Sequence, residues 1–250
     1  MQDQEIIYGK NAVEALIDSD NTKSINKILV LKNIKFDQKL KKIVDYARKN
    51  KILVQEVPKE KLNIYAKDSH QGIVALVSPI TYTELHEFIY TLKNKQDNSL
   101  VVILDGVQDP HNLGAIIRTA KCAGADAVII PQRRSASINS TVNKSSAGAI
   151  SLIPIIQVTN INQCIETLKE NNFWIVGVES TGDKNYFDVD FNMNCAIVLG
   201  GEDEGISKLV QKNCDIITKI PMPGAFNSLN VSNAASIILF EFVRQKLSKN

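Results

Sequence analysis

Cysteine and histidine are scarce in this chain of 250 residues. It has three histidines, and its four cysteines, which form no C-x-x-C pair, are Cys122, Cys164, Cys195 and Cys214. A structural zinc site requires several such ligands at short spacing, and a disulfide scaffold requires a dense, regular set of cysteines. We therefore expect neither a bound metal nor a disulfide framework.

Long apolar runs are also missing. A run of about 18 apolar residues, enough to span a membrane as a helix, occurs nowhere. The segment Met1–Glu5 is acidic and lacks the apolar core of a secretory signal. These absences lead us to expect a soluble protein of the cytoplasm.

Neither sign of charge is in large excess, since 29 Lys and Arg stand against 27 Asp and Glu. The surplus is uneven: residues 1–95 hold 16 basic and 12 acidic side chains, whereas residues 96–250 hold 13 and 15. A basic front part suits a phosphate backbone, but the same surplus is common on ordinary solvated surfaces. Charge alone leaves nucleic-acid binding open.

The front part of the chain predicts a small α/β module over residues 1–78. Its expected elements are helix 11–18, strand 25–31, helix 37–49, strand 52–57, a short helical stretch and strand 72–77. Residues 79–99 end in a tail rich in Lys, Asn and Gln and contain a short amphipathic segment at 85–92. We expect this stretch to be a linker.

Beyond the linker, apolar strand-like runs alternate with helical patterns. The expected elements are strand 100–104, helix 113–123, strand 127–130, helix 161–170, strand 174–178, strand 195–199, a helix from Ser207, strand 216–220 and a last helix to Lys246. This alternation is typical of a doubly wound parallel α/β domain, here over residues 100–250.

Three segments of this second domain carry most of the chemical information. They are Asp105-Gly106-Val107-Gln108-Asp109-Pro110-His111-Asn112-Leu113-Gly114 with Arg118, Leu199-Gly200-Gly201-Glu202-Asp203-Glu204-Gly205, and Ile220-Pro221-Met222-Pro223-Gly224 running into Asn227-Ser228-Leu229-Asn230. Each follows an apolar run and leads into a helix, so all three are expected at the carboxyl edge of one parallel sheet. That edge is where α/β proteins bind ligands.

The first segment has both a structural and a functional interpretation. Asn112 can cap a helix that starts at Leu113, and Gly114 and Ala115 leave space over that helix for a substrate. Arg118 lies on an otherwise apolar helix and needs a partner, because burying an unpaired charge is costly. We expect Glu202 to be that partner, with the guanidinium reaching back to the mouth where Asn112 lies.

The other two segments exclude several common sites. The glycines of the second lack the G-x-G-x-x-G spacing of a dinucleotide site, and Ile206-Ser207 stands where a P-loop has Lys-Ser/Thr. Ser228 has no G-x-S-x-G elbow around it, which disfavours an acyl-transfer nucleophile. Capping of the following helix is the simpler interpretation of Ser228.

Taken together, in this order and at these strand ends, the segments resemble the three motifs of the SpoU or TrmH branch of the SPOUT methyltransferases, which methylate ribose 2′-hydroxyls of RNA. The resemblance covers Val101–Arg244 almost continuously. The front module, with Tyr8-Gly9-Lys10-Asn11-Ala12-Val13 and His70-Gln71-Gly72-Ile73-Val74-Ala75, resembles the L30e-like RNA-binding domain that several of these enzymes carry. Among members, the chain looks closest to bacterial enzymes that methylate a guanosine of 23S rRNA.

This resemblance implies a trefoil knot in the carboxyl-terminal domain, S-adenosylmethionine (AdoMet) as cofactor, and a homodimer that completes the site across an interface at the last helix. It also implies cofactor contacts, largely through the backbone, by Leu199, Gly200, Ile220, Met222 and Leu229. The implied catalytic mouth consists of Asn112, Arg118, Glu202, Ser228 and Asn230. Because arginine stays protonated in proteins, we expect Arg118, oriented by Glu202 and Asn112, to stabilise the developing alkoxide rather than to act as the base.

Other functions remain open at this point. A tRNA ribose methyltransferase would share all three motifs, and only the separate front module favours ribosomal RNA. A non-catalytic RNA-binding or ribosome-assembly factor would keep the fold, although the intact mouth residues favour an enzyme. A nucleotide-dependent oxidoreductase has no fingerprint to support it.

Overall fold

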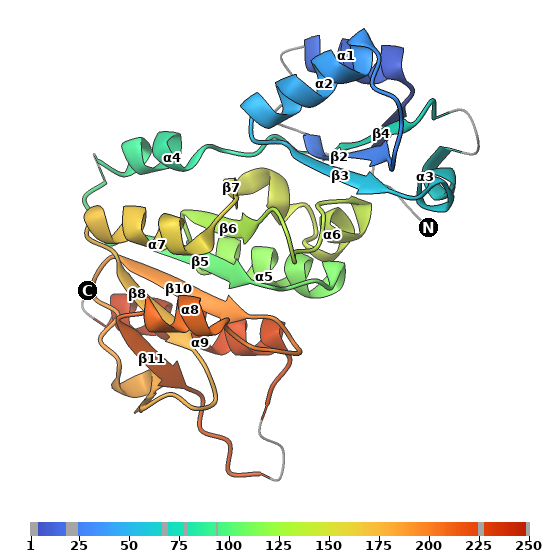
Figure 1. The fold of residues 1–250 in the computed structure, drawn as a ribbon. Coiled ribbons are helices and arrows are strands. Elements are labelled where there is room, and N and C mark those ends of the chain that lie inside the picture. The colour runs from blue at the N-terminus through green and yellow to red at the C-terminus, as the bar shows by residue number, and fades with distance from the viewer. Residues whose placement is uncertain are drawn as a thin grey trace. The chain divides into compact units, whose positions relative to one another are not determined.

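Two β-sheets organise the chain in the computed structural model (Figure 1). The four-stranded sheet belongs to a first unit, Met1–Thr81 with Ser137–Ser140, and the seven-stranded sheet belongs to a second unit formed by the other residues from Tyr82 onward. The structure describes residues 5–18, 25–66, 70–77, 80–93, 95–224 and 228–248.

The first unit is a small α/β module. Its elements are β1 (Glu5–Tyr8), α1 (Lys10–Asp18), β2 (Ile25–Leu31), α2 (Gln38–Lys49), β3 (Leu53–Val57), α3 (Lys59–Ala66) and β4 (Ile73–Val77). The strand order is β1-β4-β2-β3, with β4 antiparallel to both neighbours and β2 parallel to β3. Strand β1 is not among the predicted elements, because only its pairing with β4 distinguishes this short apolar run from a terminal loop.

Helices cover both faces of this sheet. On one face, Leu40 of α2 packs against Ile28 and Ile73. On the other, Leu62 of α3 packs against Leu29. Successive residues of β2 point to opposite faces, and its consecutive residues Ile28, Leu29 and Val30 are all buried, as expected for a sheet covered on both sides.

The basic helix α2 is partly neutralised within this unit. Lys42 forms ion pairs with Glu14 at 3.1 Å and Asp18 at 3.0 Å, and Lys39 pairs with Glu14 at 3.3 Å. Hydrogen bonds from Lys42 and Lys39 lower the pKa of the Glu14 carboxyl. These lysines therefore bridge α1 and α2.

Buried His70 has a structural role in the same unit. Its Nδ1 accepts a hydrogen bond from the Gly72 N–H at 2.9 Å, so Nε2 carries the proton and donates to Asn63 Oδ1 at 2.9 Å. The imidazole thereby fixes the turn that leads into β4.

The second unit contains the predicted parallel sheet, and this prediction is confirmed. Its elements are α4 (Leu85–Leu92), β5 (Leu100–Asp105), α5 (Pro110–Cys122), β6 (Ala127–Pro131), α6 (Ser140–Ser145), η2 (Ala149–Leu152), β7 (Ile155–Val158), α7 (Ile161–Glu170), β8 (Trp174–Val178), β9 (Lys184–Asn185), η3 (Tyr186–Asp188), β10 (Cys195–Gly200), α8 (Lys208–Lys212), β11 (Ile216–Lys219) and α9 (Val231–Leu247). The strand order is β7-β6-β5-β10-β8-β11-β9, and every pair is parallel. The short strands β7 and β9 are not among the predicted elements.

Helices also cover both faces of the second sheet (Figure 1). Helices α4, α7 and α8 share one core with the strands, and α5 and α9 pack against each other and against the opposite face. Helix α4 lies inside the stretch 79–99 that we expected to be a linker, and its Phe88 and Ile89 are buried in the core of the second unit. The amphipathic pattern of 85–92 is thus used for packing.

Strand β10 occupies the centre of the sheet. It lies between β5 and β8, although both precede it in the sequence. Helix α9, which follows later still, packs on α5 and β10. The chain therefore returns to the middle of its own sheet, and the trefoil knot stays a prediction.

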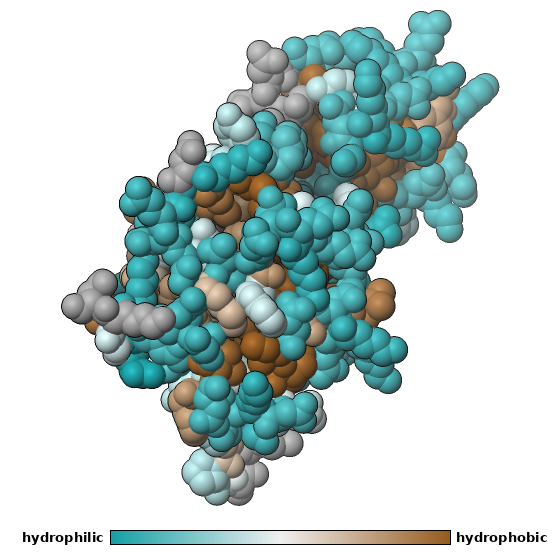
Figure 2. All heavy atoms as spheres, turned by 90° about the vertical axis from the view of Figure 1, so that its left-hand side faces the viewer, coloured by the Kyte–Doolittle hydropathy of each residue, from teal (hydrophilic) through white to brown (hydrophobic). Residues whose placement is uncertain are grey.

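Hydrophilic residues dominate the face shown in Figure 2, where hydrophobic atoms reach the surface in separate patches. Among the described residues, the large exposed hydrophobic side chains include Leu247, at 69% exposure, and Phe240, at 49%. Within this part of the chain, no helix has the length and apolar character needed to cross a membrane.

Gly114 marks the closest packing of α5. A Cβ at this position would lie 1.9 Å from Ser145 Oγ and 2.8 Å from the Val142 carbonyl oxygen, both in α6. The glycine therefore allows α6 to pack closely against α5. The expectation that it leaves room for a substrate is wrong.

We expect Gly114→Ala to lower the free energy of unfolding by about 1–3 kcal/mol, because α6 must move away from the added methyl group. Chemical denaturation measures this loss. Ser145→Gly removes two of the three atoms in the way, so the double variant should lose less stability than the sum of the two single variants. If the loss of stability in the double variant equalled the sum of the two single losses, the proposed contact between Gly114 and Ser145 would be contradicted.

Candidate active site

The three predicted segments meet at the carboxyl edge of the second sheet, as expected. They follow β5, β10 and β11, which are parallel members of that sheet. The first two segments are bonded to each other, because the Gly201 N–H donates to the Asp105 carbonyl oxygen at 2.9 Å. The Asp105 carboxylate also accepts a hydrogen bond from the Ser207 N–H at 2.8 Å.

Glycines allow the backbones of this edge to touch. A Cβ on Gly200 would lie 2.0 Å from the carbonyl carbon of Gly205, and a Cβ on Gly201 would lie 2.3 Å from the carbonyl oxygen of Gly106. Since backbone atoms cannot rotate away as a side chain can, neither position accepts a larger residue without a shift of the loop.

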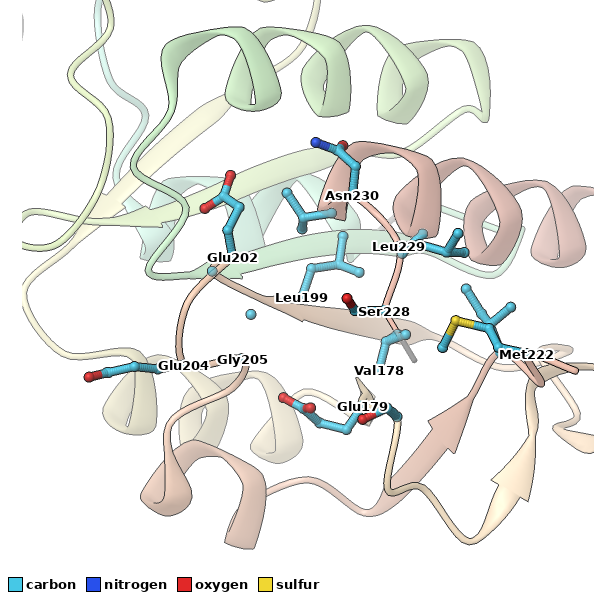
Figure 3. Close-up of a pocket in the computed structure, with 16 residues that line it drawn as sticks. Val178, Glu179, Leu199, Glu202, Glu204, Gly205, Met222, Ser228, Leu229 and Asn230 are labelled. Carbon is cyan, nitrogen blue, oxygen red and sulfur yellow. The ribbon is translucent and has the colours of Figure 1, made fainter. Parts of the chain in front are cut away.

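A cavity of about 510 Å³ opens beside these loops (Figure 3). It is lined by all five residues for which cofactor contacts are predicted: Leu199, Gly200, Ile220, Met222 and Leu229. Three of the five predicted catalytic residues, Glu202, Ser228 and Asn230, line it too. In Figure 3, Glu202 and Asn230 lie at one side of the cavity and Glu179 at the other.

Asn112 connects two of these predicted catalytic residues. Its Nδ2 donates to Glu202 Oε1 at 2.5 Å, and its Oδ1 accepts from Asn230 Nδ2 at 3.0 Å. One amide thus links the start of α5, the loop after β10 and the start of α9. The three side chains form an ordered polar network at the cavity mouth.

The expected capping role of Asn112 is wrong. Helix α5 begins at Pro110, and Asp109 caps it by accepting a hydrogen bond from the His111 N–H at 2.9 Å. Proline fits the first helical position, where no N–H is needed, so the helix starts three residues earlier than predicted. The Asn112 side chain is therefore free for Glu202.

Ser228 is not a cap either. Asn230 caps α9 by accepting from the Ser232 N–H at 2.9 Å and from its hydroxyl at 2.6 Å. This leaves Ser228, two residues earlier, in the cavity wall. Its predicted neighbour Asn227 lies outside the described residues.

Arg118 does not join this mouth within its own chain. Its side chain is exposed and is not part of the cavity wall, and in the described ranges it has no ion-pair or hydrogen-bond partner. The expected pair with Glu202 is therefore not formed. Six residues turn a helix by about 240°, so Asn112 and Arg118 leave α5 on different faces. An exposed guanidinium is solvated and needs no internal partner.

Sequence reasoning missed the contribution of β8 to the cavity. Val178 ends that strand, and Glu179 and Ser180 follow it into the cavity wall. The Glu179 carboxylate accepts a short hydrogen bond from the Ile206 N–H. Ligands of α/β proteins bind at the carboxyl edge of the parallel sheet. The same argument that located the other segments, applied to the end of β8, would have identified these residues.

The cysteines are not part of this site. Burial raises the pKa of the Cys164, Cys195 and Cys214 thiols to about 12 each, so these three remain protonated at neutral pH. Among the residues that the structure describes, no group of three or more His, Cys, Asp or Glu side chains is arranged to hold a metal ion.

Comparison with protein families gives two matches. The SpoU rRNA methylase family matches residues 99–240. A second family, described as RNA 2′-O ribose methyltransferase substrate binding, matches residues 6–83.

Individual proteins match over most of the chain. A TrmH family tRNA/rRNA methyltransferase sequence from Staphylococcus epidermidis is 46% identical over 241 residues, which are 96% of both chains. The SpoU methyltransferase AviRb from Streptomyces viridochromogenes, crystallised with AdoMet, has a TM-score of 0.63 at 23% identity and covers 98% of this chain and 92% of its own.

Two further solved structures differ in how much they match. An AdoMet-bound rRNA methyltransferase from Sinorhizobium meliloti has a TM-score of 0.61 at 24% identity and covers 97% of this chain and 87% of its own. A TrmH/SpoU tRNA modifying enzyme from A. aeolicus has a TM-score of 0.57 at 31% identity, with 66% of this chain and 83% of its own covered.

Proposed function

Because this chain belongs to the SpoU rRNA methylase family, which uses AdoMet to methylate RNA ribose, we propose that it methylates the 2′-hydroxyl of a guanosine in 23S rRNA. The observation that carries the proposed site is the Asn112–Glu202–Asn230 network at the mouth of the cavity. Ribosomal RNA is favoured because the family that matches residues 99–240 is described as rRNA methylases and because this chain also has a substrate-binding unit over residues 6–83, whereas the tRNA modifying enzyme from A. aeolicus matches 66% of the chain. This substrate would place the enzyme in the cytoplasm.

The cavity suits AdoMet in size and in the chemistry of its walls. Its volume lies within the range of small-ligand sites, and Val178, Ile220 and Leu229 supply aliphatic surface for an adenosine group. Leu229 is 43% exposed, which leaves an apolar wall for a ligand to cover. When bound, AdoMet supplies an electrophilic methyl group.

The residues at the mouth act on the ribose. A 2′-hydroxyl is a poor nucleophile at neutral pH, so it must be held in line with the methyl group while its proton leaves. Ser228 and Asn230 border the cavity where the ribose would enter and can hydrogen-bond it. Glu202, held by Asn112, orients an arginine that stabilises the developing alkoxide, and the proton passes to water or to a phosphate oxygen.

That arginine comes from the partner subunit under this proposal. Arg118 is exposed and outside the cavity of its own chain, yet a permanently charged, planar guanidinium is what a developing alkoxide needs. A symmetric homodimer would bring each Arg118 to the other subunit's mouth.

The exposed face of α9 is the proposed dimer interface. It carries Phe240 and Leu247, with Ile237 half-buried at helical spacing from both. Helix α9 packs on α5, so an interface there also brings α5 close to the partner. Exposed apolar side chains that share one helix face are the kind of surface that protein–protein interfaces use.

The substrate is tested by transfer of labelled methyl from AdoMet to unmodified 23S rRNA, to assembling large subunits and to bulk unmodified tRNA. We expect label in the ribosomal substrates alone, and about 100-fold less with Arg118→Ala, the scale of a lost oxyanion donor. Label in tRNA would overturn the substrate. Label in none of them would favour a non-catalytic assembly factor.

A further inference from the structure

The cavity wall is acidic. Glu179, Glu202 and Glu204 line it, and none of its sixteen described lining residues is Lys, Arg or His. A wall that bears only negative charge favours a cationic ligand over a neutral one of the same shape. The three carboxylates differ, however, in how their charge is compensated.

Two of the three have other partners. Glu204 forms an ion pair with Arg134, from the loop after β6, and its side chain is exposed, so solvent screens most of its charge. Glu202 is held by Asn112 at the mouth, where the ribose would enter. Glu179 has no cationic partner within the described ranges and accepts its hydrogen bond from a neutral backbone N–H.

Glu179 is also fixed in place. Its backbone N–H donates to the Thr218 carbonyl oxygen at 2.9 Å, and its carboxylate is held by the Ile206 N–H. Gly205 leaves room for it, because a Cβ there would lie 2.5 Å from Oε1. The side chain is half-buried, so its charge is only partly screened by solvent.

We propose that Glu179 is a specificity-determining residue that makes the cavity prefer the cationic methyl donor to the neutral product. This inference rests on the proposed function, since it takes AdoMet as the ligand. When the S–CH₃ bond breaks and the O–CH₃ bond forms, the sulfonium becomes a thioether, and S-adenosylhomocysteine carries one positive charge less than AdoMet. The fixed carboxylate attracts the positively charged sulfonium of AdoMet but not the neutral thioether of S-adenosylhomocysteine. The product therefore leaves more readily than the cofactor.

The test is calorimetric titration of the full-length protein with AdoMet and with S-adenosylhomocysteine, in the absence of RNA. Glu179→Gln keeps the size and one acceptor oxygen but removes the charge. We expect its AdoMet affinity to fall about tenfold and its S-adenosylhomocysteine affinity to fall less than about twofold. Glu166→Gln is the control, because this exposed carboxylate of α7 is not part of the cavity wall, and its ratio of affinities should match the wild type.

A second variant separates charge from scaffolding. Glu179→Asp keeps the charge on a shorter side chain, so we expect both affinities to drop together while their ratio stays closer to that of the wild type than to that of Glu179→Gln. Equal losses of affinity for both ligands in Glu179→Gln would overturn the inference. They would mean that the carboxylate only supports the loop or accepts a hydrogen bond from a ribose hydroxyl. If wild-type protein bound neither ligand, the proposed cofactor itself would fail, which is a distinct outcome.

Discussion

Mixing Arg118→Ala subunits with Glu202→Gln subunits is expected to restore about a quarter of wild-type methyl transfer, although each variant alone should be about 100-fold less active. Random pairing of subunits in the proposed homodimer makes half of the dimers mixed. In each mixed dimer, one site combines an intact Arg118 from one subunit with an intact Glu202 from the other. The basis is the exposed position of Arg118, outside the cavity of its own chain.

The matched control mixes Glu202→Gln with Asn230→Ala. Both residues line the cavity of the same chain, and both contact Asn112 there. Every site in such mixed dimers lacks one of them, so no activity should return. Recovery in the control, or none in the Arg118 mixture, would mean that the arginine acts within its own subunit.

Gly200→Ala is expected to weaken AdoMet binding by about 10- to 100-fold, because overpacking costs about 1–3 kcal/mol and each 1.4 kcal/mol or so lowers the affinity about tenfold. The added Cβ would lie 2.0 Å from the carbonyl carbon of Gly205 and 2.2 Å from the Ile206 nitrogen. Both are backbone atoms, so the whole loop must shift, and that loop is a wall of the cavity. Calorimetry measures the affinity directly.

Gly224→Ala serves as the comparison for this variant. It belongs to the third segment at the same sheet edge, and a Cβ there would meet no atom of the described residues within 4 Å. Its affinity should equal that of the wild type. Unchanged binding in Gly200→Ala would remove Gly200 from the cofactor wall.

Periodicity and turn chemistry predicted most of the second unit. The limits of α7 at Ile161–Glu170 and of β8 at Trp174–Val178 agree with the prediction, because Asn160 caps the helix and the strand is a short apolar run after a turn. Strand β7 was not predicted, because a run of four residues is too short to indicate a strand by itself and is recognised only by its pairing with β6.

The side-chain partners were harder to predict than the strand ends. The sequence places Asn112, Glu202 and Asn230 at one edge, and the structure adds the hydrogen bonds that order them. Position 114 requires glycine because α6 packs closely against α5 there, and this tertiary contact cannot be predicted from the local sequence. The place of Asn112 relative to Arg118 depends on where α5 begins, because Asn112 lies inside the helix instead of before it, and six helical residues turn the two side chains about 240° apart.

The central place of β10 also constrains how this enzyme is made. The cavity takes its walls from residues between Val178 and Ala234, and its mouth is closed by Asn230, near the end of the chain. A ribosome synthesising this protein must therefore release most of the polypeptide before any cofactor can bind. AdoMet therefore cannot stabilise the intermediates that form early in folding. The long-range pairing of β10 with β5 should also make folding slow.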